Sequence, residues 1–336
     1  MMTTTVENNI SNQVLTILKK IWDWIRKIPP VYPIFLVVVI GVSQLNSNFA
    51  TPNGMMAFIR RAAPLIILTM GQSFVLISGG FDLSQGAVVT LTIIGSSLII
   101  YNNEENTYLA IAIMLGLGIL IGLVNGFVVT FLKVPSLIAT LGMLLLVRGG
   151  GLYWTGGAPK GYLSEAYRFI GRGFIENIPL IGRFPMSGVI LLVVAIVLVI
   201  LFHKTNLGKQ ILAIGDNSQA AKLSGVKVRM IRIIAFTISA VCATIGGILV
   251  GGYGGVSYTA GGDMEMQAVS AAVIGGVLLL GGKGSIYDAA FGALTLEAIV
   301  SLLNLLGLPK PYRDAVQGLI IIGAVAYAGL RTKKRD

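Results

Sequence analysis

The sequence predicts an all-α fold, a polytopic transmembrane helical bundle of about ten spans. The first observation behind this prediction is composition, because 55% of the 336 residues are hydrophobic and only 12% are charged. The mean hydropathy of +0.84 lies outside the usual range of soluble domains. The second observation is that the charged residues leave long uncharged runs between them. The third is the content of 43 glycines, small residues that let helices approach closely in lipid.

The candidate spans follow from the length of these runs. A hydrocarbon core of about 30 Å takes about 20 residues of helix to cross. Long uncharged runs lie at 28–59, 62–81, 83–103, 106–132 and 233–262. Shorter or interrupted runs lie at 134–147, 184–203, 266–282, 289–309 and 315–330. We therefore predict one transmembrane domain at 33–330, after an N-terminal segment at 1–32 and before a basic tail at 331–336.

The N-terminal segment is too long and polar for a secretory signal, and no small-residue cleavage site follows it. The first hydrophobic run is therefore interpreted as a retained span. Residues 1–18 are expected to be disordered. Residues 19–27 read Lys-Lys-Ile-Trp-Asp-Trp-Ile-Arg-Lys, which places aromatic and cationic groups where a helix meets lipid headgroups. We expect an interfacial anchor there.

Glycines recur at a spacing of four in two places. Gly118, Gly122 and Gly126 form overlapping GxxxG units, and a second set is Gly247, Gly251 and Gly255. Such spacing indicates close helix packing, but it also arises from composition alone in a glycine-rich membrane chain. The sequence leaves both interpretations open.

The net charge of +11 is better explained by topology than by a nucleic-acid surface, since basic residues gather in cytoplasmic loops. Residues 204–232 hold six basic residues against one acidic residue, Asp216. The C-terminal tail and residues 19–27 are basic too. We therefore expect both termini and 204–232 on the cytoplasmic side, and acidic 102–106 outside. Arg60, Arg61 and the basic residues of 156–185 fit this orientation less well.

Residues typical of catalysis are scarce. The chain has one histidine, His203, and one cysteine, Cys242, so neither a metal cluster nor a disulfide framework is indicated. The stretch Gly281-Gly282-Lys283-Gly284 lacks the glycine at 277 and the hydroxyl residue at 284 that a phosphate-binding P-loop needs. An enzyme is the weaker interpretation, and no cofactor bound by this chain is predicted.

The centre of the basic segment, 213–226, predicts a short capped helix. Asp216, Asn217 or Ser218 can act as N-cap, and Gly225 supplies a left-handed stop. A compact helix between two spans is suited to a groove on a partner. An ordinary solvated loop is the alternative.

Several motifs resemble one family. Gly79-Gly80-Phe81-Asp82-Leu83-Ser84-Gln85-Gly86-Ala87 is similar to the G-I-D-L-S-x-G stretch of the ribose, xylose and galactose permeases of ABC importers. So are Asn125-Gly126, the stretch Val134-Pro135-Ser136-Leu137-Ile138-Ala139-Thr140-Leu141-Gly142, Arg148-Gly149 before Thr155-Gly156-Gly157, and the run that begins Gly262-Asp263-Met264-Glu265. Together they cover about 55–330. Phe81 and Gln85 depart from the family pattern.

The resemblance implies a permease of ten spans that pairs with a second copy or a related permease. It implies an extracytoplasmic sugar-binding protein, and cytosolic subunits that hydrolyse ATP with Mg. The capped helix then becomes the coupling loop to these subunits, with candidate residues Gly215, Asp216, Asn217, Ala220, Ala221, Leu223 and Gly225. Asp216 and Asn217 would cap it, and Ala220, Ala221 and Leu223 would pack against the partner. No nucleic-acid partner is expected.

Polar residues inside spans are costly in lipid, so they face a cavity or another helix. The candidates for a translocation path are Gln72, Asp82, Thr92, Asn125, Glu297 and Asn304. Asp82 is better explained as an N-cap, and Glu297 serves equally as an interface partner. Gly79-Gly80-Phe81-Asp82 and Gly261-Gly262-Asp263 lie about five spans apart, which suggests an inverted repeat.

The substrate stays open at this level. A monosaccharide such as ribose, xylose or galactose is the first expectation, and another small solute (a nucleoside, an amino acid or a signalling sugar) is the alternative. An ion-coupled secondary transporter fits less well, because it needs no coupling loop. A channel is the weakest alternative, since no filter sequence is present.

Overall fold

The structure is a computed structural model that describes residues 29–101, 103–158, 160–179 and 182–332. The predictions for 1–28, and for the tail beyond 332, lie outside these residues. Each of the ten predicted runs has a corresponding helix, although the run at 28–59 also covers the first turns of the second of these helices. These helices are α2 (Val31–Leu45), α3 (Pro52–Ile77), α4 (Gln85–Ile100), α5 (Thr107–Thr130), α6 (Ser136–Thr155), α8 (Met186–Val199), α11 (Val228–Gly254), α12 (Met264–Ile274), α13 (Ile286–Leu305) and α14 (Lys310–Thr332).

Among the described residues, six helices are long and apolar enough to cross a membrane, namely α3, α5, α6, α8 with its π-helical end, α11 and α13. Three apolar helices are shorter: α2, α4 and α12. With 16 residues in α4 and 11 in α12, these two rise about 24 and 17 Å at 1.5 Å per residue. The fold is a polytopic membrane helical bundle. The runs at 83–103 and 266–282 overstated the helices because they also count uncharged residues outside them.

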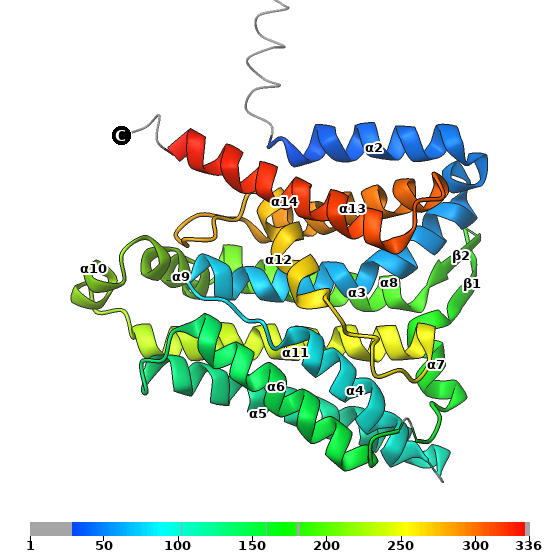
Figure 1. Cartoon of the computed structure of the whole chain (residues 1–336), viewed down its shortest axis with the longest axis horizontal. Coiled ribbons are helices and arrows are strands. Elements are labelled where there is room, and N and C mark those ends of the chain that lie inside the picture. The colour runs from blue at the N-terminus through cyan, green and yellow to red at the C-terminus, as the bar shows by residue number, and fades with distance from the viewer. Residues whose placement is uncertain (1–28, 102, 159, 180–181, 333–336) are drawn as a thin grey trace, which may run out of the picture.

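Most long helices lie along the long axis of the molecule (Figure 1). One end, the α10 end, carries α9 (Asn206–Asp216) and α10 (Ser218–Leu223). The opposite end, the hairpin end, carries α7 (Glu165–Arg172) and the antiparallel strands β1 (Phe174–Ile178) and β2 (Gly182–Pro185). Sequence reasoning did not predict α7, α9 or the hairpin, because they are short.

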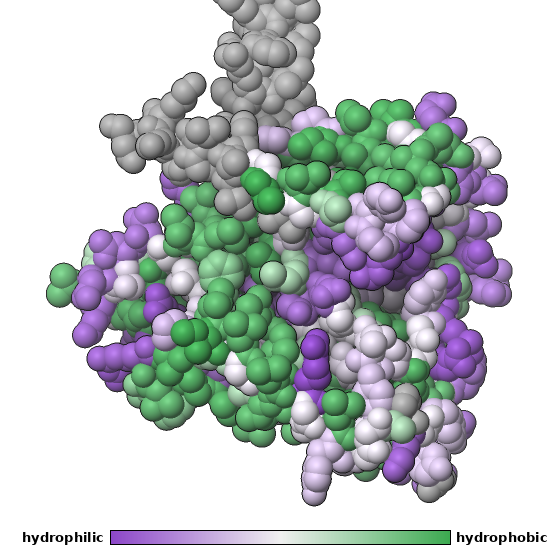
Figure 2. Space-filling model, in the orientation of Figure 1, coloured by the Kyte–Doolittle hydropathy of each residue, from purple (hydrophilic) through white to green (hydrophobic). Residues whose placement is uncertain are grey.

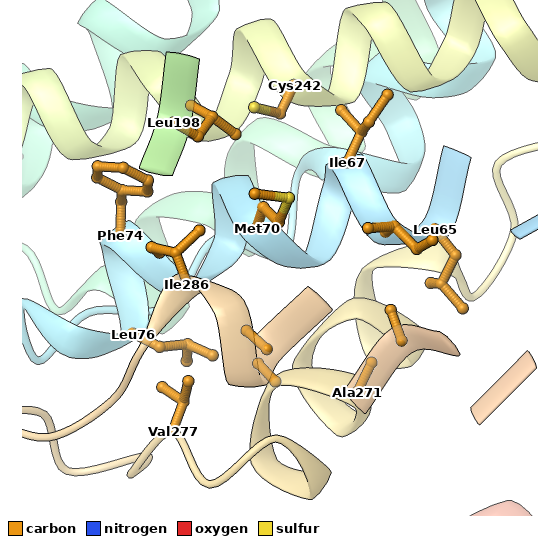
Figure 3. Packing of buried hydrophobic residues seen from close by; sticks show 14 of the residues in the cluster. Leu65, Ile67, Met70, Phe74, Leu76, Leu198, Cys242, Ala271, Val277 and Ile286 are labelled. Carbon is orange, nitrogen blue, oxygen red and sulfur yellow. The ribbon is translucent and has the colours of Figure 1, made fainter. Parts of the chain in front are cut away.

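Helix α3 forms the centre of the core. Leu65, Ile67, Met70, Phe74 and Leu76 pack with side chains from α8, α11, α12 and α13 (Figure 3). Every residue from Ala62 to Ile77 is buried. Because no side of this stretch is exposed, α3 is surrounded here by protein rather than by lipid.

Glycines bring α5 and α11 into close contact. A Cβ added at Gly118, Gly122 or Gly126 would lie 2.1, 2.5 and 2.6 Å from atoms of Thr244, Thr237 and Ile233 on α11. These distances are shorter than any ordinary contact, so a side chain would push the helices apart. The first GxxxG series is therefore a specific packing surface, and composition alone does not explain it.

Apolar side chains cover much of the outer surface (Figure 2). Leu145 and Leu146 on α6 are each 68% exposed, and Leu120 on α5 is 53% exposed. Such a surface suits lipid, which solvates apolar side chains without cost. Hydrophilic side chains gather at both ends and in one patch on the face shown (Figure 2).

Candidate functional site

The chain breaks between α3 and α4, at residues 78–84, and a buried polar network fills the break. The Asp82 carboxylate accepts hydrogen bonds from the Ser84 backbone N–H at 3.0 Å and from the Ser84 hydroxyl at 2.6 Å. Its second oxygen accepts from the Ser239 hydroxyl of α11 at 2.7 Å. Asp82 has no exposed surface. The predicted N-cap role of Asp82 is wrong, because the N-cap of α4 is Ser84 and no side chain caps this helix. The bond from the Ser84 N–H instead closes a local turn before α4.

Two amide side chains extend this network to other helices. Asn125 of α5 donates to the Ser84 hydroxyl at 3.0 Å. Gln85 donates to the Ser239 hydroxyl at 3.0 Å and to the Leu68 carbonyl at 3.2 Å. The network therefore joins α3, α4, α5 and α11 at one point. Sequence reasoning noted Gln85 only as a departure from the family pattern and missed Ser239, which lies more than 150 residues along the chain from Asp82.

The first residues of α4 and α12 meet inside the bundle. A Cβ on Gly86 would lie 2.0 Å from the Glu265 carboxylate and 2.3 Å from the Gly261 carbonyl. The Gly261 backbone N–H donates to the Thr90 hydroxyl at 3.2 Å. In Figure 1, α3 and α11 run in opposite directions, and after each of them the chain returns to the middle of the bundle, where the shorter helix begins.

The path candidates do not form one cluster. Asp82 and Asn125 come together through Ser84, but both are enclosed by protein. Gln72 is also fully buried, and its amide atoms have no hydrogen-bond partner among the described residues. None of these three reaches the surface of this chain in the conformation described.

The remaining path candidates lie on α4 and α13. Thr92 is buried and donates to the Val88 carbonyl at 2.8 Å. Glu297 is partly buried on α13. Asn304 is exposed near the end of α13 and accepts a hydrogen bond from Arg313. The structure does not bring these residues together.

The predicted capped helix is α10, and its cap is Asn217. The Asn217 side chain accepts from the backbone N–H groups of Gln219 and Ala220, both at 3.0 Å. Asp216 is the last residue of α9 and makes no such bond, so its predicted capping role is wrong. Gly225 has a φ of 84°, the left-handed conformation expected at the stop.

The faces of α10 differ sharply. Leu223 is 90% exposed, although leucine is a large apolar residue, and Ala220 is exposed too. Ala221 is only 5% exposed and belongs to the core of this chain. The prediction that Ala221 packs against a partner is wrong in this conformation, because one face of a short helix must bury against its own bundle.

Glycines let the backbone of α9 pack directly against the end of α3 and against the loop before α13. A Cβ on Gly215 would lie 1.9 Å from the Ile77 carbonyl and 2.3 Å from the Gly282 nitrogen. The Gly282 N–H donates to the Ile77 carbonyl at 2.9 Å, and a Cβ on Gly281 would lie 2.8 Å from the Gly79 nitrogen. The glycine-rich stretch that failed as a P-loop is thus a packing junction between α9, the end of α3 and the loop before α13.

A bundle with an apolar outer surface, two helices that begin inside it and an exposed helix at one end defines the class as a multi-span membrane protein. The chain belongs to the family described as the permease component of the branched-chain amino acid transport system, which matches residues 54–325.

Two relatives are ribose import permeases. The chain is 35% identical to the ribose import permease protein RbsC of Escherichia coli strain K12 over 300 residues, 86% of this chain and 90% of that protein. It is 33% identical to RbsC of Bacillus subtilis strain 168, over 89% of this chain and 92% of that protein.

A third relative is the autoinducer 2 import system permease protein LsrC of Salmonella typhi. The identity is 32%, over 88% of this chain and 82% of that protein. No solved structure matches the chain.

This chain is therefore the permease of a binding-protein-dependent ABC importer, a multi-pass protein of the inner membrane. It is not the enzyme of the system, since ATP is hydrolysed on a separate subunit, and permeases of this family bind no cofactor themselves. A permease of this class works with an ATPase and a binding protein. The family resemblance of the sequence motifs is confirmed.

Proposed function

We propose that this permease imports a small sugar of the ribose type. The observation that carries the proposal is the identity to two ribose import permeases over almost the whole length of each. Autoinducer 2 is the second candidate, because LsrC matches nearly as well. The network at Asp82 is closed, so selectivity depends on the binding protein and on residues that become accessible when the bundle opens.

The α10 end faces the cytoplasm in this proposal, and the N- and C-termini lie on the same side. The charges support it, because Lys204, Lys209 and Lys222 lie exposed at this end. Glu104 and Glu105 then fall outside, on the turn before α5.

Helix α10 docks into a groove on the ATPase. The exposed Leu223 supports this role, since an isolated leucine at the tip of a polar loop gains free energy when a partner buries it. When α9 moves, the end of α3 and the loop at 278–284 must move with it, because their backbones are in direct contact at Gly215.

A second copy of the chain, or a related permease, covers the polar patch on the face in Figure 2. Asp263 at the start of α12 forms an ion pair with Lys310 of α14 at 3.7 Å, and Lys310 also pairs with Asp314 at 2.8 Å. Arg148 is exposed two-thirds of the way along α6. Charged groups on an apolar bundle are costly in lipid and suit a water-filled path between two subunits.

We also retain the inverted repeat as part of the proposal. The opposite directions of α3 and α11, and the meeting of α4 with α12, support it. Superposition of 62–155 on 233–330 tests it, and a failure to superpose would remove it.

Uptake into proteoliposomes tests the function. Vesicles carrying the permease with its ATPase and binding protein are given labelled ribose, xylose, galactose, autoinducer 2 or a nucleoside. We expect ATP-dependent uptake of ribose, or of autoinducer 2 as the second candidate. Uptake of only another solute would overturn the sugar assignment, and uptake driven by an ion gradient without the ATPase would overturn the importer mechanism.

Two variants of α10 test the coupling. Leu223→Asp removes the exposed apolar side chain and should lower ATP-dependent uptake at least tenfold, because a buried carboxylate in the interface costs several kcal/mol. Gln219→Asp is the matched control, since it adds the same charge to an exposed position of the same helix. Equal uptake by both variants would contradict the docking of Leu223.

A further inference from the structure

A pocket of about 490 Å³ opens at the α10 end, between three segments of the chain. Its walls come from the loop after α3, from the turn between α5 and α6, and from the first turns of α11. The lining includes Ser78, Lys133, Ser136, Arg229, Arg232 and Phe236. Two of the permease motifs contribute residues to this pocket, at Gly79-Gly80 and at Val134-Pro135-Ser136, but none of the roles given to those motifs above involves an anion.

The charge of the lining is entirely positive. Lys133, Arg229 and Arg232 are its charged residues, and no lining residue is acidic. The ion pairs found among the described residues involve none of the three. Three cations around one cavity repel each other, so the arrangement is stabilised when an anion enters.

Arg232 is only partly satisfied by the protein. One guanidinium nitrogen donates to the Ser78 carbonyl at a long 3.4 Å, and its buried Nε has no hydrogen-bond partner among the described residues. Guanidinium groups bind phosphate through several donors at once. The helices α6 and α11 both begin at the pocket, and helix N-termini favour anions.

The backbone holds Lys133 in an unusual conformation. Its φ of 57° is left-handed, a strained conformation for a non-glycine residue. Lys133 lies in the turn between α5 and α6 and lines the pocket there.

An apolar surface adjoins the cations. The Arg229 guanidinium lies 5.0 Å from the centre of the Phe131 ring, and Phe131 stacks on Phe127. Phe127, Phe131 and Leu132 are 48%, 47% and 61% exposed. A phosphate bound in the pocket would therefore lie next to this exposed apolar surface, which is suited to contact acyl chains.

We infer that this pocket binds a phosphate group, either the headgroup of an anionic phospholipid or a soluble phosphate ester. Basic pockets between transmembrane helices bind anionic headgroups by charge and hydrogen bonding. The inference does not depend on which solute the permease imports.

Native mass spectrometry of the delipidated full-length permease tests the inference. Phosphatidylglycerol and phosphatidylcholine with the same acyl chains are added in turn. We expect preferential retention of phosphatidylglycerol. The variant Lys133→Asn/Arg229→Gln should lose affinity for it on the order of tenfold, because each basic residue near an anionic headgroup raises the affinity several-fold. Asparagine is chosen because it tolerates the left-handed conformation.

The controls separate charge from folding. Lys133→Arg/Arg229→Lys keeps both charges and should keep retention. Lys204→Gln/Lys209→Gln removes two exposed cations at the same end of the molecule and should also keep it. Equal retention by the charge-removing pocket variant and this control would overturn the inference.

A second arm identifies the source of the phosphate. Glycerol 3-phosphate and inorganic phosphate are added at millimolar concentration while retained lipid and the unfolding temperature are followed. Displacement of the lipid, with stabilisation that the pocket variant loses, assigns a soluble phosphate. Pocket-dependent lipid retention without displacement assigns a phospholipid headgroup. No binding of either probe above that of the pocket variant would overturn the inference.

Discussion

The break after α3 and the segment around α10 use the same local chemistry at opposite depths. Gly79 and Gly225 both have left-handed φ values, 81° and 84°. Asp82 and Asn217 both accept the backbone N–H two residues further on, at 3.0 Å in each case. Yet Asp82 is fully buried, whereas Asn217 is exposed. The same turn chemistry therefore serves an interior joint in one place and a surface helix in the other.

The difference lies in what surrounds each turn. At Asp82 the chain itself supplies hydrogen-bond partners, from Ser84 just before α4 and from Ser239 of α11. At α10, Leu223 is exposed and no residue of the described ranges covers it. We expect the first region to determine the stability of the folded bundle, and in the proposed function the second is completed by the ATPase. Four predictions test this contrast.

The largest effect is expected at Asp82. Asp82→Ala removes the acceptor of three hydrogen bonds and leaves the buried Ser84 and Ser239 groups without it. An unsatisfied buried polar group costs about 1–3 kcal/mol, so we expect a loss of roughly 3 kcal/mol or more. Thermal unfolding of the purified permease in detergent measures it.

Asp82→Asn serves as the matched control, because it keeps the shape and one acceptor oxygen. Its unfolding temperature should fall between those of Asp82→Ala and the unmodified protein. If Asp82→Ala unfolds at the same temperature as the unmodified protein but no longer imports substrate, Asp82 belongs to the path rather than to the interior joint.

The second prediction concerns the glycine junction. Gly215→Ala places a methyl group 1.9 Å from the Ile77 carbonyl, so backbone must move. Overpacking of this kind costs about 1–3 kcal/mol, and we expect about 2 kcal/mol in thermal unfolding. Gly225→Ala is the control, because nothing lies within 4 Å of its new Cβ and only the left-handed φ is penalised. A smaller loss for Gly215→Ala than for Gly225→Ala would refute the junction.

The sequence predicted the helices better than their depth. Uncharged runs located each of the ten helices because lipid excludes charges wherever a helix crosses. The runs did not reveal that α4 and α12 begin inside the bundle. Before α4, residues such as Phe81 and Leu83 are as apolar as a helix, and before α12 the uncharged run continues to 262, past the end of α11 at Gly254. A break in a membrane helix changes the backbone hydrogen bonds but not the hydropathy of the segment, so hydropathy does not detect it.

The candidate sites show the same limit. Gly225 and Asn217 were recognisable from local turn chemistry, which acts over a few residues. The partner of Asp82 was not, since Ser239 reaches it only through the packing of α11 on α4. The inward face of Ala221 was also hidden, because a six-residue helix carries too short a pattern to show which side is buried.

The third prediction returns to the exposed region. Asn217→Ala removes the cap of α10 and should destabilise that helix by about 1 kcal/mol. Hydrogen exchange at residues 219–224 should become several-fold faster, while exchange in α3 stays unchanged. Ser218→Ala is the control, since this side chain makes no cap hydrogen bond. Faster exchange throughout the bundle would mean that α10 is coupled to the stability of the interior and is not a separate surface helix.

The smallest change in stability is expected at Leu223. Comparing it with Ala221 distinguishes the exposed face of α10 from its buried face. Leu223→Asp should change the unfolding free energy of the permease alone by no more than about 0.5 kcal/mol, because a 90% exposed side chain has few contacts to lose. Ala221→Asp introduces the same group two residues away, at a position that is 5% exposed, and should cost several kcal/mol. Thermal unfolding of the two variants, without ATPase, separates the faces of α10. A large loss in Leu223→Asp would mean that Leu223 packs within the chain, and the exposed region would then need no partner to complete it.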